Sequence, residues 1–511
     1  MFNRANALFA READSADKIA IRFEGGETSF ATLARQVRQM AGALAALGVA
    51  RGVHVGLLLP ASPEFIIVEQ ALFALGAPIT PVNILYRPAE IAHAVECCDL
   101  AFIITTEALA SAASSALPAS CRPLLVETAV HGAAGASIPA ALAASPPLAD
   151  LAAIGADDPV FHLLTSATTG KAKGVILTAG NLAANYDRTP AWLGLDASDV
   201  ILCALPLYNT FGLNQCINAM LVTGATMVLL PRFDATHCIE VTAEYGCTFL
   251  PAVPTMLQKI FDHPGAKGAS LASLRGIMTG GAPVPSALLQ RIITAAPSVR
   301  VLTGYGLTEG TALVTLTEVR LDANGELQRG RTIGRVLDGM DLAIVDEAGE
   351  RCPAGTAGEI VVAGPNLMAG YYKAPDDSAA ALRGGWLYTG DIGYIDDEGY
   401  AYIVDRKKDV IIRGGQNIYP VDIEEVLYQI QGVAEAAVVA RGDEVLGEVP
   451  AAFVAASPGY ALDPEVLIEH CRAHLARYKV PASVTILPEL PKGPTGKILR
   501  RALRDTPVQA A

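Results

Sequence analysis

The chain has 511 residues, and this length predicts two to four structural units at about 100–200 residues per domain. Its formal net charge is −14, and no stretch dense in Lys and Arg offsets it, so the composition disfavours nucleic-acid binding. The nine cysteines are scattered and none forms a CxxC pair, which disfavours a zinc site or a disulfide framework.

No apolar run reaches the ~18 residues that are needed to cross a bilayer. Residues 1–20 include acidic side chains and lack the apolar centre of a signal peptide. From these two features we expect a soluble, cytoplasmic protein that keeps its N-terminus.

Helical and strand patterns alternate in the first 150 residues. Apolar side chains recur at helical spacing over 33–47, and a second helix is predicted over 65–75. Short buried strands are predicted at 54–60 and 101–107. This alternation predicts a parallel sheet covered by helices. The segment 108–156 is rich in Ala, Ser, Pro and Gly, and we expect surface loops there with one or two modest helices.

From residue 157 the alternation resumes, and strands are predicted at 200–207, 225–231, 247–254 and 274–280. From about residue 340, short strands separated by turn residues predict a β-rich subdomain. A compact α/β unit is predicted after residue 405, with helices near 421–430 and 464–476 and strands at 433–440, 450–456 and 482–488.

One polar loop carries a chemical signal by composition alone. Residues 165–174 read Thr-Ser-Ala-Thr-Thr-Gly-Lys-Ala-Lys-Gly, between two apolar strand-like segments. Small residues let backbone N–H groups approach an anion, and hydroxyl and ammonium groups add further donors. The loop therefore indicates phosphate binding, with an ordinary polar turn as the structural alternative. Neither this loop nor 493–497 has the G-x4-G-K-[ST] pattern, which disfavours a P-loop NTPase or a kinase of that type.

Four further segments follow in a defined order. They are Gly-Tyr-Gly-Leu-Thr-Glu at 304–309, Tyr-Thr-Gly-Asp at 388–391, Asp-Arg-Lys-Lys-Asp at 405–409 running into Arg-Gly-Gly-Gln-Asn at 413–417, and Pro-Lys-Gly-Pro-Thr-Gly-Lys at 491–497. Together with the loop at 165–174, they resemble the motifs of the adenylate-forming superfamily, the AMP-dependent synthetases and ligases that include acyl-CoA synthetases. The resemblance extends from about residue 25 to residue 503.

This resemblance implies an α/β fold. A large N-terminal adenylation domain (1–404) would contain two α/β subdomains and a β-barrel-like subdomain. A hinge (405–409) would join it to a small, mobile α+β C-terminal domain (410–511).

The resemblance also implies a reaction in two steps. A carboxylic acid would react with ATP and Mg²⁺ to give an acyl-adenylate and pyrophosphate, and coenzyme A would then take the acyl group as a thioester and release AMP. A carrier-protein phosphopantetheine is the alternative acceptor, and a catalytically inert nucleotide-binding relative is the alternative function. The sequence leaves open whether the chain forms a homodimer.

The family's catalytic roles fall on three residues. Lys497 would be the cation that contacts both the carboxylate and the α-phosphate, Glu309 would hold Mg²⁺, and Thr308 would donate to phosphate. Mg²⁺ is a hard cation that prefers oxygen ligands, such as the carboxylate of Glu309. Without the motifs, Lys497 and Glu309 would be interpreted as ordinary surface residues.

The family's nucleotide site includes Asp391 as acceptor for the ribose hydroxyls, Arg406 as a ribose or phosphate partner, and Tyr305 against adenine. A turn-stabilising Asp and a core Tyr are the structural alternatives. The remaining residues implied to bind nucleotide or CoA are Thr165, Ser166, Thr168, Thr169, Gly170, Lys173, Gly281, Ala282, Pro283, Gly306, Gly414 and Gly415. Lys408 would be the hinge at which the small domain rotates, exchanging Lys497 for the loop around Gly414 and Gly415.

The loop departs from the family pattern at two positions. Ala167 stands in place of a glycine and Ala172 in place of a proline. We expect weaker nucleotide binding or a loop that becomes ordered on closure.

The acyl pocket would include Tyr208, Asn209, Phe211, Gly280 and Gly304. Many relatives have His in place of Asn209, and an Asn cannot act as acid or base. Asn209 would instead hydrogen-bond either a polar group of the substrate or a buried carbonyl of the protein. Acetate-specific members of the family carry a Trp at the place of Gly304, so the resemblance implies a deeper pocket here. No Arg or Lys occurs in 204–216 or 278–285, which favours a medium-sized apolar or aromatic acid over a dicarboxylate and leaves a long-chain fatty acid open.

Overall fold

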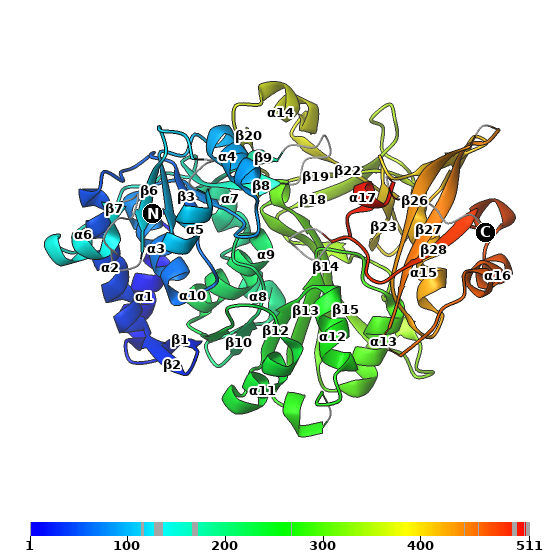
Figure 1. Ribbon diagram of the computed structural model, residues 1–511, viewed down its shortest axis with the longest axis horizontal. Helices are drawn as coiled ribbons and strands as arrows, with labels where there is room; N and C mark the ends of the chain where they lie inside the picture. The colour runs from blue at the N-terminus through cyan, green and yellow to red at the C-terminus, as the bar shows by residue number, and fades with distance from the viewer. Residues whose placement is uncertain are drawn as a thin grey trace.

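The structure is a computed structural model that describes residues 2–113, 117–126, 136–165, 172–266, 268–443, 445–457, 459–492, 498–504 and 506. Within these residues the strands form four sheets, and helices cover the two large ones (Figure 1). None of the helices in these ranges is both long and apolar enough to cross a membrane.

The first large sheet has the strand order β20-β9-β8-β4-β3-β5-β6-β7. Its strands in chain order are β3 (Val55–Leu58), β4 (Ile79–Pro81), β5 (Phe102–Thr105), β6 (Arg122–Leu125), β7 (Ala136–Ser137), β8 (Pro159–Thr165), β9 (Lys173–Thr178) and β20 (Gly370–Tyr371). The strands from β7 to β8 are parallel, whereas β9 runs antiparallel to both β8 and β20. The late strand β20 is thus joined to the strand that follows the polar loop.

Helices connect these strands and begin with recognisable signals. The associated helices are α1 (Asn6–Ser15), α2 (Phe30–Ala46), α3 (Pro63–Leu75), α4 (Pro88–Cys97), α5 (Glu107–Ala113), α6 (Ile138–Ala144), α7 (Ala179–Asn185) and α8 (Thr189–Leu193). Ser29 caps α2 by accepting from the backbone of Thr32, and Pro63 and Pro88 begin α3 and α4. Every residue of α3 from Phe65 to Leu75 is buried, so this helix is packed on all sides.

The second large sheet has the order β16-β15-β14-β13-β12-β10-β11-β1-β2, with β17 beside β15. Its strands are β1 (Ile19–Phe23), β2 (Gly26–Ser29), β10 (Val200–Cys203), β11 (Thr226–Leu229), β12 (Phe249–Ala252), β13 (Gly276–Gly280), β14 (Arg300–Leu307), β15 (Ala312–Leu321), β16 (Leu327–Gln328) and β17 (Arg335–Val336). The strands β10 to β14 pair in parallel, and their helices are α11 (Ala235–Tyr245), α12 (Pro254–Asp262) and α13 (Ser286–Ala295), with a short 3₁₀ turn at η2 (Gly268–Leu271). One continuous hydrophobic core runs through both large sheets.

A smaller antiparallel sheet follows, with the order β18-β19-β22-β21 and with β23 beside β22. Its strands are β18 (Asp341–Val345), β19 (Gly358–Ala363), β21 (Leu382–Arg383), β22 (Trp386–Ile395) and β23 (Ala401–Arg406), and α14 (Pro375–Ala381) precedes β21.

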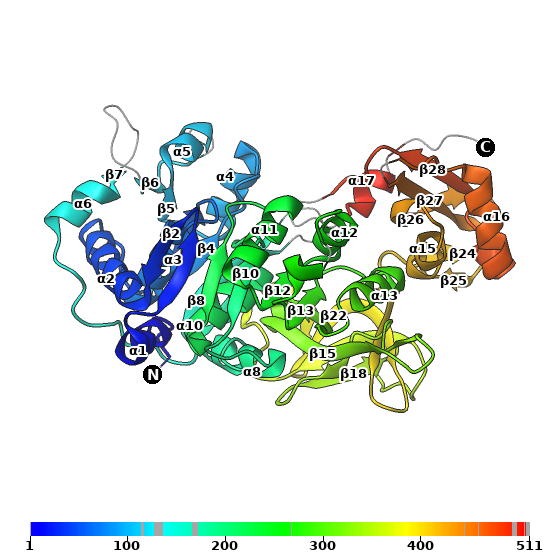
Figure 2. The ribbon, with the colours of Figure 1, turned by 90° about the horizontal axis from the view of Figure 1, so that it is seen from below.

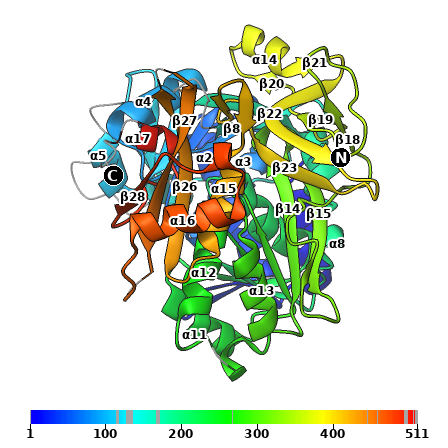
Figure 3. The same cartoon turned by 90° about the vertical axis from the view of Figure 1, so that its right-hand side faces the viewer.

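The last sheet belongs to a small C-terminal unit with hydrophobic clusters of its own. It contains β24 (Ile411–Arg413), β25 (Gln416–Ile418), β26 (Val433–Asp443), β27 (Gly447–Ala456) and β28 (Ser483–Leu487). Its helices are α15 (Pro420–Tyr428), α16 (Pro464–His474), the 3₁₀ turn η4 (Arg477–Lys479) and α17 (Arg500–Arg504). Figure 3 looks onto this unit, with α16 in front of its strands.

The predicted fold class is confirmed, with mixed α/β sheets, a β-rich piece and a small C-terminal unit. Each helix and strand named from the sequence pattern has a counterpart, and most differ only by a few residues at their ends. The segment 108–156 contains the short helix α6 and the C-terminal part of α5, as expected, but it also contains the strands β6 and β7, which were not predicted. The division at 405–409 stays a prediction. In the structure these residues form the end of β23 and most of the turn that leads to β24.

Candidate functional site

The carboxyl ends of β13 and β14 lie side by side, with Gly280 paired in register to Gly304. A Cβ on Gly304 would be 2.5 Å from the carbonyl oxygen of Thr315, and one on Gly280 would be 2.9 Å from the carbonyl oxygen of Gly304. Close approach of the backbones therefore explains both glycines without a ligand. Ligands of open parallel sheets bind outside this end of the strands, so the position also fits a site.

Three side chains from separate strands meet just beyond these glycines. The Tyr305 hydroxyl of β14 donates to Asp391 Oδ2 of β22 at 2.5 Å, and Arg406 Nε of β23 lies 3.3 Å from Asp391 Oδ1. Asp391 and Arg406 are also direct partners in the β22–β23 register. Burial, together with the adjacent carboxylate, raises the pKa of Tyr305 well above its usual value, so its hydroxyl stays a donor. The structure brings these three predicted residues together.

The ring of Tyr305 is part of a hydrophobic cluster. It packs among Val314, Ile344, Ile360 and Val362, and only 8% of the residue is exposed. Tyr305 is therefore a core residue that also supports Asp391.

Glu309 lies in η3 (Thr308–Gly310), the turn between β14 and β15. Its carboxylate Oε1 accepts from the Tyr371 hydroxyl at 3.0 Å, and its carbonyl accepts from the backbone N–H of Met368 at 2.8 Å. Thr311 and Ala312 follow, with φ of +58° and +96°. Positive φ angles are unfavourable for residues that have a Cβ, so this backbone is strained.

Glycine is needed at position 306 to complete this turn. A Cβ on Gly306 would be 1.8 Å from the carbonyl oxygen of Ala312. The turn that presents Thr308 and Glu309 thus depends on close backbone packing.

The two ends of the polar loop are fixed by the β8–β9 pair, in which Thr165 is the partner of Lys173. Lys173 Nζ lies 2.6 Å from Asp377 Oδ1 of α14 and 5.1 Å from the centre of the Tyr371 ring. The carbonyl of Ala172 is hydrogen-bonded to His93 Nε2 at 2.7 Å. The predicted residues Ser166, Thr168, Thr169 and Gly170, with the substituted Ala167, lie outside the described residues, as does Lys497.

The segment after β13 contains Gly281, Ala282 and Pro283. Gly281 has a φ of +78°, and a Cβ there would meet no atom within 4 Å, so only the backbone conformation favours glycine. Gly281 and Pro283 are exposed beside the strand ends.

Gly414 and Gly415 form the turn of the β24–β25 hairpin, with φ of +57° and +80°. Figure 2 shows this hairpin at the outer end of the molecule, away from β13 and β22. The structure does not bring this turn to the site around Tyr305 and Asp391.

The predicted acyl-pocket residues Tyr208, Asn209 and Phe211 follow β10. Asn209 Oδ1 accepts from the backbone N–H of Gly212 at 3.1 Å and so caps α9 (Thr210–Gly212). Capping is neither of the two roles expected from the sequence. Burial raises the pKa of Tyr208 to about 12, with Tyr86 as a nearby second cause.

The helix that begins with this cap has an unusual middle section. The short α9 continues as a π-helix, η1 (Leu213–Asn218), and then as α10 (Ala219–Thr223). Such sections are rare and occur often at functional sites.

Lys408 lies in the turn between β23 and β24, and its carbonyl accepts from Arg504 at 3.3 Å. Nearby, the Arg500 guanidinium contacts Asp405 at 3.2 Å and Glu424 at 2.7 and 2.8 Å. The predicted hinge is thus surrounded by charged contacts from the C-terminal unit.

Two residues of this site were missed from the sequence, Tyr371 and Asp377. Tyr371 lies in the Gly-Tyr-Tyr-Lys segment at 370–373 and Asp377 follows it, and this stretch carries no recognisable pattern for phosphate or metal binding. The pairing of β20 with β9 places them beside Lys173 and Glu309.

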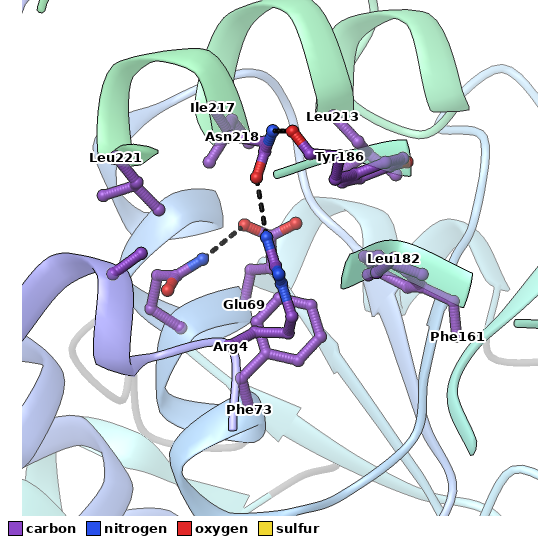
Figure 4. A pocket seen from close by; sticks show the side chains of 12 residues that line it. Arg4, Glu69, Phe73, Phe161, Leu182, Tyr186, Leu213, Ile217, Asn218 and Leu221 are labelled. Atoms are coloured by element: carbon purple, nitrogen blue, oxygen red, sulfur yellow. Dashed lines mark hydrogen bonds between the residues drawn. The ribbon is translucent and has the colours of Figure 1, made fainter. Parts of the chain in front are cut away.

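A separate small cavity, of about 20 Å³, lies between α1, α3 and the π-helix (Figure 4). Glu69, Arg4, Tyr186 and Asn218 point into it, and none of them is a predicted site residue. Burial raises the pKa of Glu69 to about 8.

The residues present fit a nucleotide with a divalent cation. In the part of the chain that the structure describes, no three His, Cys, Asp or Glu side chains gather into a metal cage. Mg²⁺ is typically held by one or two carboxylates together with substrate phosphates, and Glu309 supplies such a carboxylate. The carboxylate of Asp391 has lone pairs beyond those used by Tyr305 and Arg406, as binding a ribose would require.

Residues 8–372 match the model of the AMP-binding enzymes, and residues 422–497 match the model of the AMP-binding enzyme C-terminal domain. The chain belongs to this family, the adenylate-forming superfamily.

Relatives with known names align over nearly the full chain. A feruloyl-CoA synthase from an Amycolatopsis species is 34% identical, over 95% of this chain and 95% of the relative. An indoleacetate–CoA ligase from Aromatoleum aromaticum is 35% identical over 95% and 94%, and a long-chain-fatty-acid–CoA ligase from Bacillus subtilis is 32% identical over 95% and 91%.

Solved structures agree with this assignment. ATP-bound MatB from Rhodopseudomonas palustris superimposes with a TM-score of 0.88 at 28% identity, covering 99% of this chain and 98% of that one. A benzoate CoA ligase from Burkholderia xenovorans gives 0.88 at 26%, covering 99% and 100%. O-succinylbenzoate coenzyme A synthetase from Bacillus subtilis, in complex with ATP and a magnesium ion, gives 0.85 at 29%, covering 98% and 99%.

Proposed function

We propose that this AMP-forming acyl-CoA synthetase activates a medium-sized apolar acid, with aromatic acids as the first choice. Enzymes of this class use ATP with Mg²⁺ and CoA. Their acid and ATP give an acyl-adenylate and pyrophosphate, and CoA then displaces AMP to leave a thioester.

The predicted pocket segments support an apolar acid. Residues 204–216 and 278–285 contain no Arg or Lys that could pair with a second carboxylate. The atom nearest to the Cβ position of Gly304 is the Thr315 carbonyl oxygen at 2.5 Å, and the next two, Leu313 Cδ1 at 3.0 Å and Met278 Cε at 3.1 Å, are apolar. Relatives named for feruloyl, indoleacetate and benzoate substrates favour a ring-containing acid, and the relative from Bacillus subtilis keeps long-chain fatty acids as the second candidate.

The arrangement of Tyr305, Asp391 and Arg406 is the observation that carries the adenylation proposal. Asp391, held by Tyr305, would accept hydrogen bonds from the ribose hydroxyls, and Arg406 would bind beside it. The attacking carboxylate and the α-phosphate are both anionic, so the site needs cations and oriented donors. We propose that Lys173 and Lys497 supply this positive charge. Thr308 would donate a hydrogen bond to phosphate, and Glu309 would hold Mg²⁺, which offsets phosphate charge.

The acceptor is proposed to be CoA. The three relatives above are named for CoA, which favours it over a carrier-protein phosphopantetheine. Because the Gly414–Gly415 turn lies away from the site, we propose that the C-terminal unit, 410–511, rotates about 405–409 relative to 1–404 before thioester formation.

Acid-dependent exchange of labelled pyrophosphate into ATP tests the proposal, run over a panel of aromatic, medium-chain, long-chain and dicarboxylic acids. We expect exchange with aromatic or medium-chain acids, and thioester when CoA is added. Asp391→Asn serves as the site control and should raise the KM for ATP. Absence of exchange with every acid would contradict an active adenylating enzyme, and exchange with dicarboxylates alone would contradict the pocket.

A further inference from the structure

Tyr371 lies between two groups of the proposed site, the Lys173 ammonium and the Glu309 carboxylate. Its backbone is fixed on both sides, because it pairs with Val175 in the β20–β9 ladder and its N–H donates to Ser378 Oγ at 2.8 Å. The side chain therefore starts from a well-defined position on the strand next to the polar loop.

The Tyr371 hydroxyl donates to Glu309 Oε1 at 3.0 Å. A phenol is protonated at neutral pH, so the Tyr371 hydroxyl is the donor and the carboxylate is the acceptor in this bond. A hydrogen bond to one carboxylate oxygen restricts the rotation of the carboxyl group. The other oxygen, Oε2, has no hydrogen bond within the described part of the chain and is open to a further ligand.

The ring of Tyr371 faces the other group. Lys173 Nζ lies 5.1 Å from the ring centre, within the range of a cation–π contact, and is also paired with Asp377 at 2.6 Å. One side chain thus contacts the lysine that ends the polar loop through its ring and the carboxylate of η3 through its hydroxyl.

We propose that Tyr371 is a positioning residue for adenylation, which orients Glu309 toward the divalent cation of the bound nucleotide and holds Lys173 beside its phosphates. This inference rests on the proposed function, in which Glu309 holds the cation. Partners that orient a metal-binding carboxylate typically change metal affinity about 10–100-fold when they are removed.

The test measures binding as well as activity. Mn²⁺ is titrated into the full chain with the analogue α,β-methylene-ATP, in which the bond that adenylation would break is replaced, and free Mn²⁺ is counted by electron paramagnetic resonance. Tyr371→Phe, which keeps the ring and loses the hydroxyl, should weaken Mn²⁺ binding about 10-fold. Its affinity for the analogue in EDTA, measured by calorimetry, should not change. In activity assays the Mg²⁺ requirement should rise by a similar factor, with kcat restored at saturating Mg²⁺.

Tyr372→Phe is the matched control, because the neighbouring tyrosine loses the same atom but donates to Asp99 and stacks on His162. It should bind Mn²⁺ as the parent does. Tyr371→Leu removes the ring as well, and its affinity for the analogue in EDTA should also fall because Lys173 loses its ring contact. Unchanged Mn²⁺ affinity in Tyr371→Phe, or an equal loss in Tyr372→Phe, would overturn the inference.

Glu309→Gln separates this inference from the proposed function. If Glu309→Gln lowers Mn²⁺ affinity and Tyr371→Phe does not, the positioning role alone is wrong. If Glu309→Gln binds Mn²⁺ like the parent, the metal role of Glu309 is wrong and the inference fails with it. Thermal melting of each variant identifies a folding defect, and a variant that fails to fold is replaced by Tyr371→Trp, which keeps a ring without the hydroxyl.

Discussion

Arg500 and Asp405 connect the C-terminal helix α17 to the end of β23. The guanidinium lies 3.2 Å from Asp405 Oδ1 and binds both carboxylate oxygens of Glu424 at 2.7 and 2.8 Å. Asp405 is buried, and this burial raises its pKa to about 6. If the C-terminal unit rotates about 405–409, Arg500 and Glu424 move together, whereas the contact with Asp405 changes.

We therefore expect Asp405→Asn to destabilise the orientation of the C-terminal unit in which Arg500 contacts Asp405. Loss of a charged hydrogen bond of this kind costs about 1.5–3 kcal/mol, so adenylation should slow about 10- to 150-fold. Thioester formation from supplied acyl-adenylate should be retained. Glu398→Gln, which removes an exposed carboxylate paired with Arg329, is the control. Equal losses in both half-reactions would show that Asp405 does not act through domain orientation.

The buried carboxyl of Glu69 predicts a pH dependence of stability. Its pKa in the folded chain is about 8, against an ordinary value of 4.5, because it is buried, with Gln70 and Arg4 as weaker opposing influences. Between these two values the folded state binds a proton that the unfolded state lacks, so the free energy of unfolding falls as pH rises. The slope is about 1.4 kcal/mol per pH unit inside this window and vanishes above it.

Glu69→Gln replaces the protonated carboxyl with a neutral amide and should remove this component. Denaturant unfolding at pH 5 to 9 should show the variant gaining stability over the parent as pH rises to about 8. Glu64→Gln, at the exposed start of the same helix, should follow the parent at every pH. Parallel curves for the parent and Glu69→Gln would mean that the cavity admits enough water to keep Glu69 ionised.

Local patterns were sufficient for much of the fold and for part of the site. The helical spacing over 33–47 and the short apolar runs before residue 281 correspond to α2 and to β10–β13, since burial of one face or of a whole strand leaves a local signature. Tyr305, Asp391 and Arg406 were identified through motifs, and the structure places them in contact.

The remainder depends on contacts between segments far apart in the chain. Tyr371 is 62 residues from Glu309, and only the pairing of β20 with β9 places it there. Asn209 caps a helix too short to be predicted by periodicity. The tight approach of Gly304 to Thr315 likewise follows from the β14–β15 pairing and not from the sequence around the glycine.

Lys497→Ala tests the proposed catalytic cation. Removing one oriented donor from a site where charge develops costs about 10²–10³ in rate, so pyrophosphate exchange should fall by that factor. Thioester formation from supplied acyl-adenylate should be largely kept. Lys492→Ala is a suitable control, because Lys492 is paired with Glu435 and Glu489. A matching loss in both half-reactions would reject this role for Lys497.

Lys408→Pro tests the proposed hinge directly. Proline fixes φ near −65° and also restricts the preceding residue, so a turn that must change its backbone angles is locked. The turn between β23 and β24 should still form, because the backbone N–H groups of Asp409 and Val410, not that of Lys408, donate to the Arg406 carbonyl. We expect pyrophosphate exchange to change less than about 3-fold and thioester formation to fall about 10-fold or more, as for other gating steps.

Lys408→Ala removes the same charge without restricting the backbone and should keep both half-reactions. The comparison therefore separates rigidity from the loss of the ammonium group. If Lys408→Pro forms thioester at the parent rate, the change in backbone angles occurs elsewhere in the chain. If Lys408→Ala is as slow as Lys408→Pro, the ammonium group and not the flexibility of the turn is what the second half-reaction requires.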